Sequence, residues 1–443
     1  MRSPLAKVLH PLLGRSMVGW IVRACEDAGA TPIVVVNHQA EAVQAALAGS
    51  EASFARQSAP LGTGDALRAA LPLLPASGPV LVTAGDTPLL TAASLRRLLD
   101  AHRAHGGAST VATFHVADPT GYGRIVTDGG LRIVEQVECT PEQAAIRQVN
   151  SGVYVFEAGY LRDRLPTLAP HGQKGEYYLT DLVTRDTVVA DGFDADEFMG
   201  VNDRAALADA RRVLRRRVNR AWALAGVDFA DLEAASVDVD CVLRPDAHIG
   251  FGAVVEGRSD IGGSIGTHSV VRDSVVEAGA AVKEHSVLEA AHVCAGAVVG
   301  PFARLRPGAV IEPDAHIGNF VEVKNARVRR GAKANHLAYL GDADVGERAN
   351  IGAGTITCNY DGFGKYRTDI GAGAFIGSNT ALVAPVRVGD NAIIGAGSTI
   401  TEDVPAEAVA IARGAQVTKP DLAPKIRGRA KARKELMIQR DKA

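Results

Sequence analysis

Three stretches of this 443-residue sequence contain side chains that could take part in chemistry. The stretch TCNYDGFGKYRTD, residues 357–369, offers amide and hydroxyl groups, two tyrosines and two cations. His336, in ANHLAYLGD, can exchange a proton near neutral pH, as a general base must. Asp86 follows the run LVTAG, where a carboxylate could bind Mg²⁺. Each stretch could also have a purely structural role, as a solvated loop, a packed histidine or a helix cap, respectively. The surrounding elements must therefore decide between a chemical and a structural role.

The composition limits the classes of protein to which the chain can belong. The 48 basic and 50 acidic residues leave almost no net charge, which gives no indication of nucleic acid or a membrane as partner. No apolar run approaches the roughly 18 residues of a membrane helix, and Lys7 and His10 interrupt the opening stretch where a signal peptide would be unbroken. The cysteines form no CxxC pair, which argues against zinc and against a disulfide framework: Cys25, Cys139, Cys241, Cys294 and Cys358. These features predict a soluble protein of the reducing cytoplasm.

The first 200 residues or so predict an α/β fold. Short apolar runs of strand type occur at 32–37, 79–86, 109–116 and 152–157. Helical segments such as 91–105 alternate with these runs, and the alternation favours a parallel sheet. Asp86 then lies at the carboxyl end of a strand, where parallel sheets place ligands.

An amphipathic helix is expected after this region. The run DRAALADARRVLRRRVNRAWALAG ends at Gly226, and glycine commonly follows the end of a helix. We therefore expect a first domain over 1–201 and a linker helix over 202–226.

Beyond about residue 240, aliphatic residues recur at every sixth position. Three series show this spacing: Leu243, Ile249, Val255 and Ile261; Val293, Val299, Leu305, Ile311, Ile317 and Val323; and Ile370, Ile376, Leu382, Val388, Ile394 and Ile400. Neither a helix nor an ordinary strand has period six. A hexapeptide repeat does, because three flat faces close one triangular coil and stacked coils bury the aliphatic column. The spacing predicts a parallel β-helix over 227–415, with a glycine-rich antiparallel sandwich as the alternative.

The six-residue rhythm is interrupted at 357–369, and this stretch is expected to leave the coil as a protruding loop. Each coil contacts only its neighbours, so an interruption is a place where special chemistry can sit. Ordered loops longer than a turn are often functional. The basic segment 416–443 lies past the coils and is expected to be a flexible tail, with contact to a CoA phosphate as the alternative.

Motifs throughout the chain resemble the bacterial family of bifunctional N-acetylglucosamine-1-phosphate uridylyltransferases and glucosamine-1-phosphate N-acetyltransferases. The matching motifs are AKVLHPL, LGTGDA, GDTPL, DPTGYGRIV, VNSGVYVF, GEYYLTD and GVNDR in the first half, and GPFARLRPGA, GNFVEVKNA, NHLAYLGDADVGERANIGAGTITCNYDG and FIGSNTALVAPV in the second. The resemblance implies a Rossmann-like nucleotidyltransferase domain followed by a left-handed β-helix, assembled as a homotrimer. It also implies synthesis of UDP-N-acetylglucosamine for peptidoglycan and lipopolysaccharide.

In the second half, the resemblance implies an acetyltransferase site around His336. His336 would remove the proton of the amine that attacks the thioester, and Glu322 would orient its imidazole. The residues implied for the sugar phosphate are Arg306, Lys324, Tyr339 and Asn350. Those implied for acetyl-CoA are Asn359, Tyr360, Lys365, Ser378, Ala396 and Arg413, with Ser378 donating to the thioester oxygen or the developing oxyanion. The loop at 357–369 would reach a neighbouring subunit's site.

In the first half, the resemblance implies a uridylyltransferase site that uses Mg²⁺ and UTP. Asp86 and Asn202 would bind the metal, and Lys7 would neutralise the phosphates. The residues implied for the uridine nucleotide are Gln57, Gly62 and Thr63. Those implied for N-acetylglucosamine 1-phosphate are Gly123, Glu135 and Asn150.

The chain departs from the family pattern at several positions. Pro60 replaces a common glutamine, Asp65 a usual histidine, and Ala84 a frequent hydroxyl residue. The family opens with a strand and a loop of the form LAAGxGTRM, whose backbone N–H groups bind phosphate, and Met1 falls on the final Met of that motif. A start placed downstream of the natural one would explain this.

Three readings of the activity follow from these departures. The first is the bifunctional enzyme, the second is acetyl transfer alone, and the third is nucleotidyl transfer with the β-helix as a trimerising scaffold. For the sequence as printed, we expect good acetyl transfer and poor or no uridylyl transfer. We also expect unpaired strand edges in the α/β half, and lower stability there than in the coil.

Overall fold

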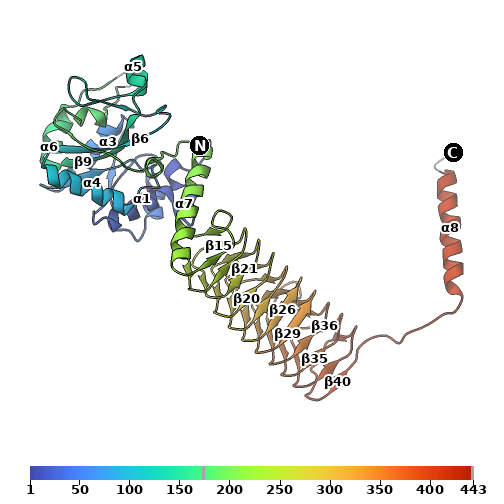
Figure 1. Cartoon of the computed structure of the whole chain (residues 1–443). Helices are drawn as coiled ribbons and strands as arrows, with labels where there is room; N and C mark the ends of the chain where they lie inside the picture. The colour runs from blue at the N-terminus through green and yellow to red at the C-terminus, as the bar shows by residue number, and fades with distance from the viewer. Residues whose placement is uncertain (172–174, 441–443) are drawn as a thin grey trace. The chain divides into compact units, whose positions relative to one another are not determined.

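The computed structural model describes residues 1–171 and 175–440 (Figure 1). The chain divides into two compact units, Met1–Ala290 and Ala291–Ala443. The first unit holds an α/β region and several coils of short strands, and the second holds further coils and a C-terminal helix. The domain boundaries expected at 201, 226 and 415 stay predictions.

The main sheet of the α/β region is mixed. Its order is β10 (Val188–Ala190), β6 (Ser109–His115), β9 (Gln148–Glu157), β7 (Arg124–Val126) and β8 (Arg132–Val134), and β5 (Pro79–Val82) also pairs with β9. β10 is parallel to β6, whereas β9 is antiparallel to β5, β6 and β7. The expectation of a parallel sheet is wrong for β9, because the chain reaches it through β8 and the short helix α5 (Pro141–Ala144) rather than through a long helical crossover.

Several helices of this region begin at side-chain caps. Ser16 accepts the N–H of Gly19 at the start of α1 (Met17–Asp27), and Thr91 accepts that of Ser94 at the start of α4 (Ala92–His105). The other helical and hairpin elements are η1 (Lys7–Leu9), β1 (Pro11–Leu12), β2 (Arg15–Ser16), α2 (Ala40–Ala46), α3 (Thr63–Ala70), η2 (Leu71–Leu73), η3 (Gln136–Glu138), α6 (Ala158–Arg164), η4 (Leu165–Thr167), η5 (Leu179–Leu182) and η6 (Ala195–Phe198).

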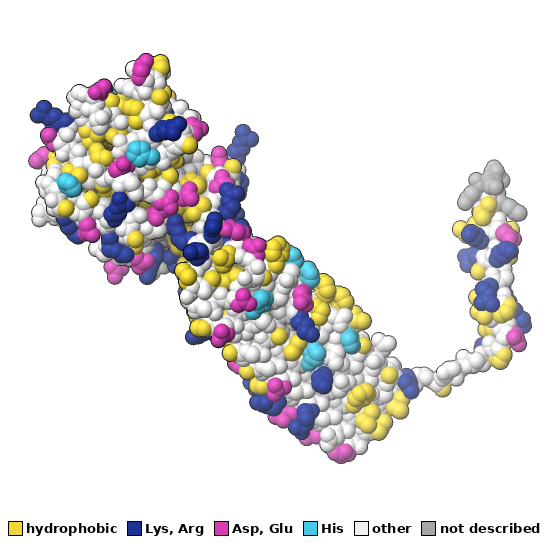
Figure 2. Space-filling model, in the orientation of Figure 1, with side chains coloured by type: hydrophobic (Ala, Val, Ile, Leu, Met, Phe, Trp, Pro, Cys, Tyr) yellow, Lys and Arg dark blue, Asp and Glu magenta, His cyan; other side chains and the backbone are white. Residues whose placement is uncertain are grey.

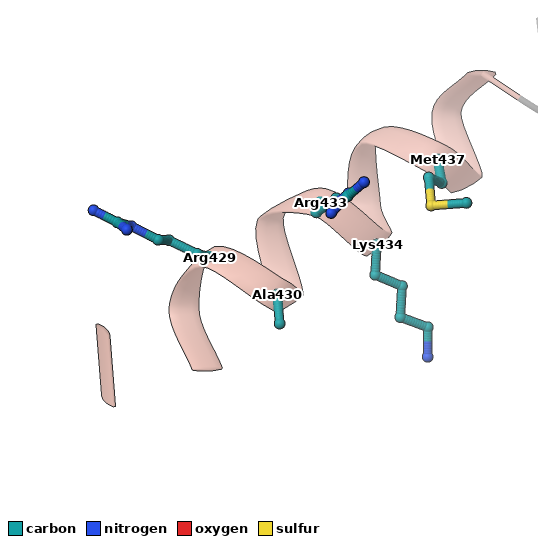
Figure 3. Close-up of a pocket in the computed structure, with 5 residues that line it drawn as sticks. All are labelled: Arg429, Ala430, Arg433, Lys434 and Met437. Atoms are coloured by element: carbon teal, nitrogen blue, oxygen red, sulfur yellow. The ribbon is translucent and has the colours of Figure 1, made fainter. Parts of the chain in front are cut away.

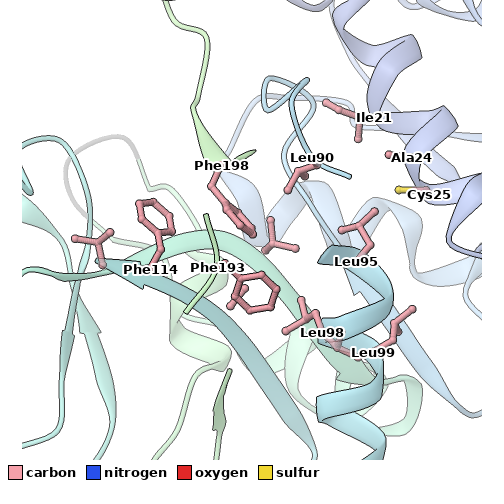
Figure 4. Packing of buried hydrophobic residues seen from close by; sticks show 14 residues of the cluster. Ile21, Ala24, Cys25, Leu90, Leu95, Leu98, Leu99, Phe114, Phe193 and Phe198 are labelled. Carbon is pink, nitrogen blue, oxygen red and sulfur yellow. The ribbon is translucent and has the colours of Figure 1, made fainter. Parts of the chain in front are cut away.

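A buried apolar cluster joins α1, α4 and the main sheet (Figure 4). Leu95 and Leu98 of α4 belong to it, as does Phe114 of β6, whose ring stacks on Phe198 at 5.5 Å between centroids. Every residue of β6 except the last is buried. The strand is therefore covered on both faces, which explains its nearly continuous apolar run.

Strands β3 (Ile33–Val36) and β5 border a cavity of about 1060 Å³ instead of pairing with each other. Among the described strands, β3 pairs only with the parallel strand β4 (Ser53–Arg56), and β5 only with β9. Apolar residues of α1, including Ile21 and Val22, line the cavity as well. Both strands thus have an edge whose backbone groups lack a strand partner, as expected for this part of the sheet.

Helix α7 (Arg204–Leu224) forms in the segment expected to be a linker helix. Asp203 caps it by accepting the N–H of Ala206 at 2.8 Å. Its buried residues include Leu207 and Leu214, which pack in a cluster with Met17 of α1. The helix is therefore anchored to the α/β region by one apolar face, while most of its arginines remain on the other side.

Short parallel strands follow α7 in three sheets. In the first unit the sheets are β11 (Asp228–Phe229), β14 (His248–Ile249), β17 (Ser264–Ile265), β20 (Ala281–Val282); β12 (Ser236–Val237), β15 (Val254–Glu256), β18 (Val270–Arg272), β21 (Val287–Glu289); and β13 (Val242–Leu243), β16 (Asp260–Ile261), β19 (Val275–Val276).

The second unit contains three sheets of the same kind. They are β23 (Val298–Val299), β26 (His316–Asn319), β29 (Lys333–His336), β32 (Asn350–Ile351), β35 (Phe375–Ile376), β38 (Ile393–Ile394), β40 (Val409–Ala410); β24 (Arg304–Leu305), β27 (Glu322–Lys324), β30 (Tyr339–Gly341), β33 (Ile356–Cys358), β36 (Ala381–Val383), β39 (Thr399–Ile400); and β22 (His292–Val293), β25 (Val310–Ile311), β28 (Arg327–Val328), β31 (Ala343–Val345), β34 (Thr368–Ile370), β37 (Val386–Val388).

These sheets confirm the hexapeptide prediction. Every aliphatic residue of the three six-residue series is buried. Neighbouring strands within each sheet are parallel, for example β27 with β30, so the antiparallel sandwich is wrong. Three parallel sheets with one buried aliphatic residue per hexad form the left-handed β-helix implied by the resemblance.

Helix α8 (Leu422–Arg440) lies in the segment expected to be a flexible basic tail. Its side chains from 422 to 438 are all exposed, and basic ones occur along its whole length (Figure 2). A shallow hollow on it is bordered by Arg429, Ala430, Arg433, Lys434 and Met437 (Figure 3). Within the described part of the chain, no helix is both long enough and apolar enough to cross a membrane.

Candidate active sites

His336 stands at the end of β29 with its ring exposed. Its Nδ1 lies 2.8 Å from Oδ1 of Asn319, the residue directly opposite it on β26. An amide oxygen only accepts hydrogen bonds, so Nδ1 carries the proton. Nε2 then keeps its lone pair, and the ring can accept a proton there, as a general base must.

Glu322 has a different partner from the one expected. Its carboxylate accepts a hydrogen bond from Arg306 at 2.9 Å. The side chain bonded to the His336 ring is Asn319. The spacing offered a signal for this residue, because Asn319 precedes His336 by 17 residues, which is one coil at this point of the β-helix.

Three cations gather near Glu322. The ammonium groups of Lys324 and Lys365 are neighbours. The contact and charge of Lys365, followed by desolvation and then by the charge of Arg306, lower the pKa of Lys324. Two adjacent ammonium groups repel each other unless an anion lies between them. Arg306, Lys324 and Lys365, named here the cation cluster, therefore form a site suited to a phosphate group.

Asp342 fastens the base of the loop that carries Lys365. Burial alone would raise the pKa of its carboxyl, but hydrogen bonds from Asn325 and Asn359 and the charges of Lys365 and Lys324 hold that pKa below its usual value. Asn359 is itself buried and donates to Asp342. The carboxylate thus stays ionised and ties the loop to the coil beneath it.

The loop between β33 and β34 protrudes, as expected. Phe363 at its tip is 99% exposed and Tyr360 is 61% exposed. The hydroxyl of Tyr360 donates to the carbonyl of Gly362 at 2.6 Å, within the loop. Tyr360 therefore presents its ring to the surroundings, whereas Lys365 lies beside Lys324 of the same chain.

Two other residues predicted for the sugar phosphate belong to neighbouring coils. Tyr339 on β30 lies opposite Glu322, next to the cation cluster. Asn350 on β32 lies opposite Lys333, the first residue of the strand that carries His336. Both residues are half-buried.

Three residues predicted for acetyl-CoA meet at one corner of successive coils. The N–H of Gly397 donates to the carbonyl of Ser378 at 2.8 Å. Arg413 donates to the carbonyl of Ala396 at 2.6 Å. Ser378, Ala396 and Arg413 are exposed, so this corner offers a hydroxyl group, open backbone and a cation to one extended ligand.

A second constellation lies in the α/β region, where three residues far apart in the sequence converge. The ammonium of Lys7 donates to Asp86 at 2.5 Å and to Oδ1 of Asn202 at 2.9 Å. The N–H of Val201 donates to the carbonyl of Asp86 at 2.8 Å, which holds the Asn202 segment against the turn that follows β5. The Lys7 ammonium already bridges the carboxylate of Asp86 and the amide oxygen of Asn202. Mg²⁺ binds oxygen ligands of these two kinds, so Asp86 and Asn202 fit the metal.

The residues predicted for the acetylated sugar phosphate also come together. The N–H of Asn150 donates to the carbonyl of Gly123 at 2.9 Å, and a Cβ added at Gly123 would lie 3.6 Å from the Glu135 carboxylate. Burial, followed by the charge of Glu138, raises the pKa of Glu135. Glu135 and Asn150 line the same cavity as Lys7 and Asp86.

The residues predicted for the uridine nucleotide surround the start of α3. Gln57 is buried and donates to the carboxylate of Asp65 at 2.8 Å and to the carbonyl of Gly62 at 3.3 Å. Gly62 has φ +96°, a conformation that favours glycine. The hydroxyl of Thr63 accepts the N–H of Leu179 at 3.1 Å. Asp65, which departs from the family pattern, thus holds the Gln57 side chain.

Comparisons with known proteins match both regions. Residues 1–151 match the family model of the MobA-like NTP transferase domain, and residues 367–402 match that of the bacterial transferase hexapeptide, six repeats. Three relatives are each described as bifunctional protein GlmU. That of Pelobacter propionicus is 47% identical over 95% of this chain and 94% of its own length, that of Trichlorobacter lovleyi 48% over 95% and 94%, and that of Sorangium cellulosum 46% over 97% and 95%.

Proposed function

Since the chain belongs to the family of bifunctional GlmU proteins, we propose that its two sites carry out two successive transfers to one sugar phosphate. The chain is a bifunctional transferase. It transfers an acetyl group from acetyl-CoA to glucosamine 1-phosphate. It then transfers a uridylyl group from UTP to N-acetylglucosamine 1-phosphate, which gives UDP-N-acetylglucosamine and pyrophosphate. The observation that carries the residue assignments is that each predicted constellation converges within one compact unit.

In the acetyltransferase site, the cation cluster binds the phosphate of glucosamine 1-phosphate. Lys365, expected to contact acetyl-CoA, is assigned to this phosphate instead because it lies beside Lys324. Nε2 of His336 accepts the proton of the sugar amine as its nitrogen forms a bond to the thioester carbonyl. The carbon–sulfur bond then breaks and CoA leaves as the thiolate. The Ser378 hydroxyl donates to the thioester oxygen, where negative charge develops. Support comes from the open Nε2 of His336 and from the adjacent ammonium groups of Lys324 and Lys365.

In the uridylyltransferase site, Asp86 and Asn202 would hold Mg²⁺. When bound, the ion neutralises charge on the triphosphate of UTP during displacement at the α-phosphorus. Lys7 moves from its present partners to the phosphate oxygens, while Glu135 and Asn150 hold the acetylated sugar phosphate. Weak uridylyl transfer by the sequence as printed stays a prediction.

The assembly is a homotrimer formed by the β-helix. The second unit exposes a column of apolar side chains at one corner of successive coils, in which the rings of Phe302 and Phe320 stack at 5.5 Å and Leu337 follows. These side chains are 48%, 56% and 61% exposed, respectively, which favours their burial against another copy. The cytoplasmic location also stays a prediction.

Separate assays of the two half-reactions test this function. Acetyl-CoA with glucosamine 1-phosphate should release CoA thiol rapidly, and UTP with N-acetylglucosamine 1-phosphate and Mg²⁺ should release pyrophosphate only slowly. Asp86→Ala should abolish only the second reaction and weaken Mn²⁺ binding measured by electron paramagnetic resonance. An Asp86→Ala protein that binds Mn²⁺ normally would refute the metal assignment.

A further inference from the structure

We propose that Asn319 is a positioning residue for acetyl transfer, which holds the His336 imidazole with its proton on Nδ1 and leaves Nε2 to accept the proton of the sugar amine. This inference rests on the proposed acetyltransferase function. Asn319 belongs to neither ligand set expected from the sequence, and its role follows from the contact between two adjacent coils.

Asn319 holds His336 through both its side chain and its backbone. Its Oδ1 lies 2.8 Å from the ring Nδ1, and its carbonyl accepts the N–H of Leu337 at 3.1 Å. The preceding residue, Gly318, permits this close approach, because a Cβ there would lie 1.9 Å from the carbonyl oxygen of Asn335. The ring and the chain that carries it are thus held by a single residue of the coil below.

An uncharged partner suits this base. A carboxylate at the same position would stabilise the imidazolium and keep the ring protonated to higher pH. Glu322, the carboxylate expected in this role, is instead held by Arg306 at 2.9 Å. Asn319 can therefore select the tautomer without adding a negative charge next to the ring.

Two substitutions separate positioning from simple support of the coil. Asn319→Ala removes the acceptor, so kcat for acetyl transfer should fall roughly tenfold, the worth of one hydrogen bond, while KM for both substrates changes little. Asn319→Asp restores an acceptor with a charge. It should recover most of kcat at high pH and shift the acidic limb of the kcat/KM profile upward by about one pH unit.

Asn391→Ala is the matched control. Asn391 is an exposed coil asparagine whose amide donates to Glu407 at 2.6 Å, so its loss tests coil support alone and should change neither kcat nor the pH profile. An Asn319→Asp protein with the parental pH profile, or an Asn319→Ala protein with parental kcat, would overturn the proposal. His336→Ala separates failure of the Asn319 proposal from failure of the proposed function. Retained acetyl transfer in that variant would refute the proposed function of His336 itself.

Discussion

The acetyltransferase and uridylyltransferase sites are assembled from the sequence in different ways. In the second unit, Arg306 meets Glu322 and Asn319 meets His336 across 16 and 17 residues, in each case between adjacent coils of the β-helix. In the α/β region, Lys7 meets Asp86 and Asn202 across 79 and 195 residues. A periodic fold converts sequence spacing into contact directly, whereas the α/β site depends on how several separate elements pack.

The largest effect is expected at the base of the acetyltransferase site. His336→Ala should lower the rate of acetyl transfer by about 10² to 10⁴, because the loss of a general base typically costs that much. Pyrophosphate release from UTP should stay at the parental level, since the two sites share no residue. The measurement is the release of CoA thiol and of pyrophosphate by the same preparation.

A second experiment asks which chain completes each acetyltransferase site. Because Lys324 and Lys365 are neighbours within one chain, Lys324→Ala and Lys365→Ala subunits should stay inactive after mixing. Mixing Lys365→Ala with His336→Ala subunits should instead restore activity in about a quarter of the sites, if base and cation cluster come from different subunits of a trimer. Subunit exchange is verified by native mass spectrometry. Recovery in the first mixture would contradict a phosphate site built within one chain.

The two regions should also differ in local stability. Strands β3 and β5 border a cavity, and on one edge neither has a partner among the described strands. Their backbone amides should therefore exchange with deuterium roughly tenfold faster than those of β27 and β30. Strand β6, which is paired on both sides, is the control within the α/β region. Equal protection of β3 and the coil strands would remove this contrast.

The smallest effect is expected at Glu135. Its folded-state pKa is raised, so its ionised form destabilises the fold at pH values above that pKa, and the penalty disappears below the ordinary pKa of glutamate. Glu135→Gln should therefore raise the Tm of the α/β region by about 2 °C or less at pH 8, and leave it unchanged near pH 4. Calorimetry at the two pH values measures this, and a stabilisation that persists at pH 4 would point to a cause other than ionisation.

Residue spacing alone predicted most of the coil. Each buried aliphatic residue, such as Ile317 or Val323, has its packing partners one coil away, so period six specifies the fold, the buried column and the place where the loop leaves. The candidate base His336 could be named from its residue type and motif, because an imidazole is suited to that task wherever the coil exposes it.

Tertiary structure decided the features that depend on the approach of particular backbones and side chains. The reversed direction of β9, the cavity between β3 and β5, and the meeting of Lys7 with Asp86 follow from the packing of distant segments, which no local period encodes. A finer cause explains why Asn319, rather than the expected Glu322, contacts the His336 ring. Both residues are one coil or less from His336 in sequence, and only the direction of each side chain determines which of them reaches the ring.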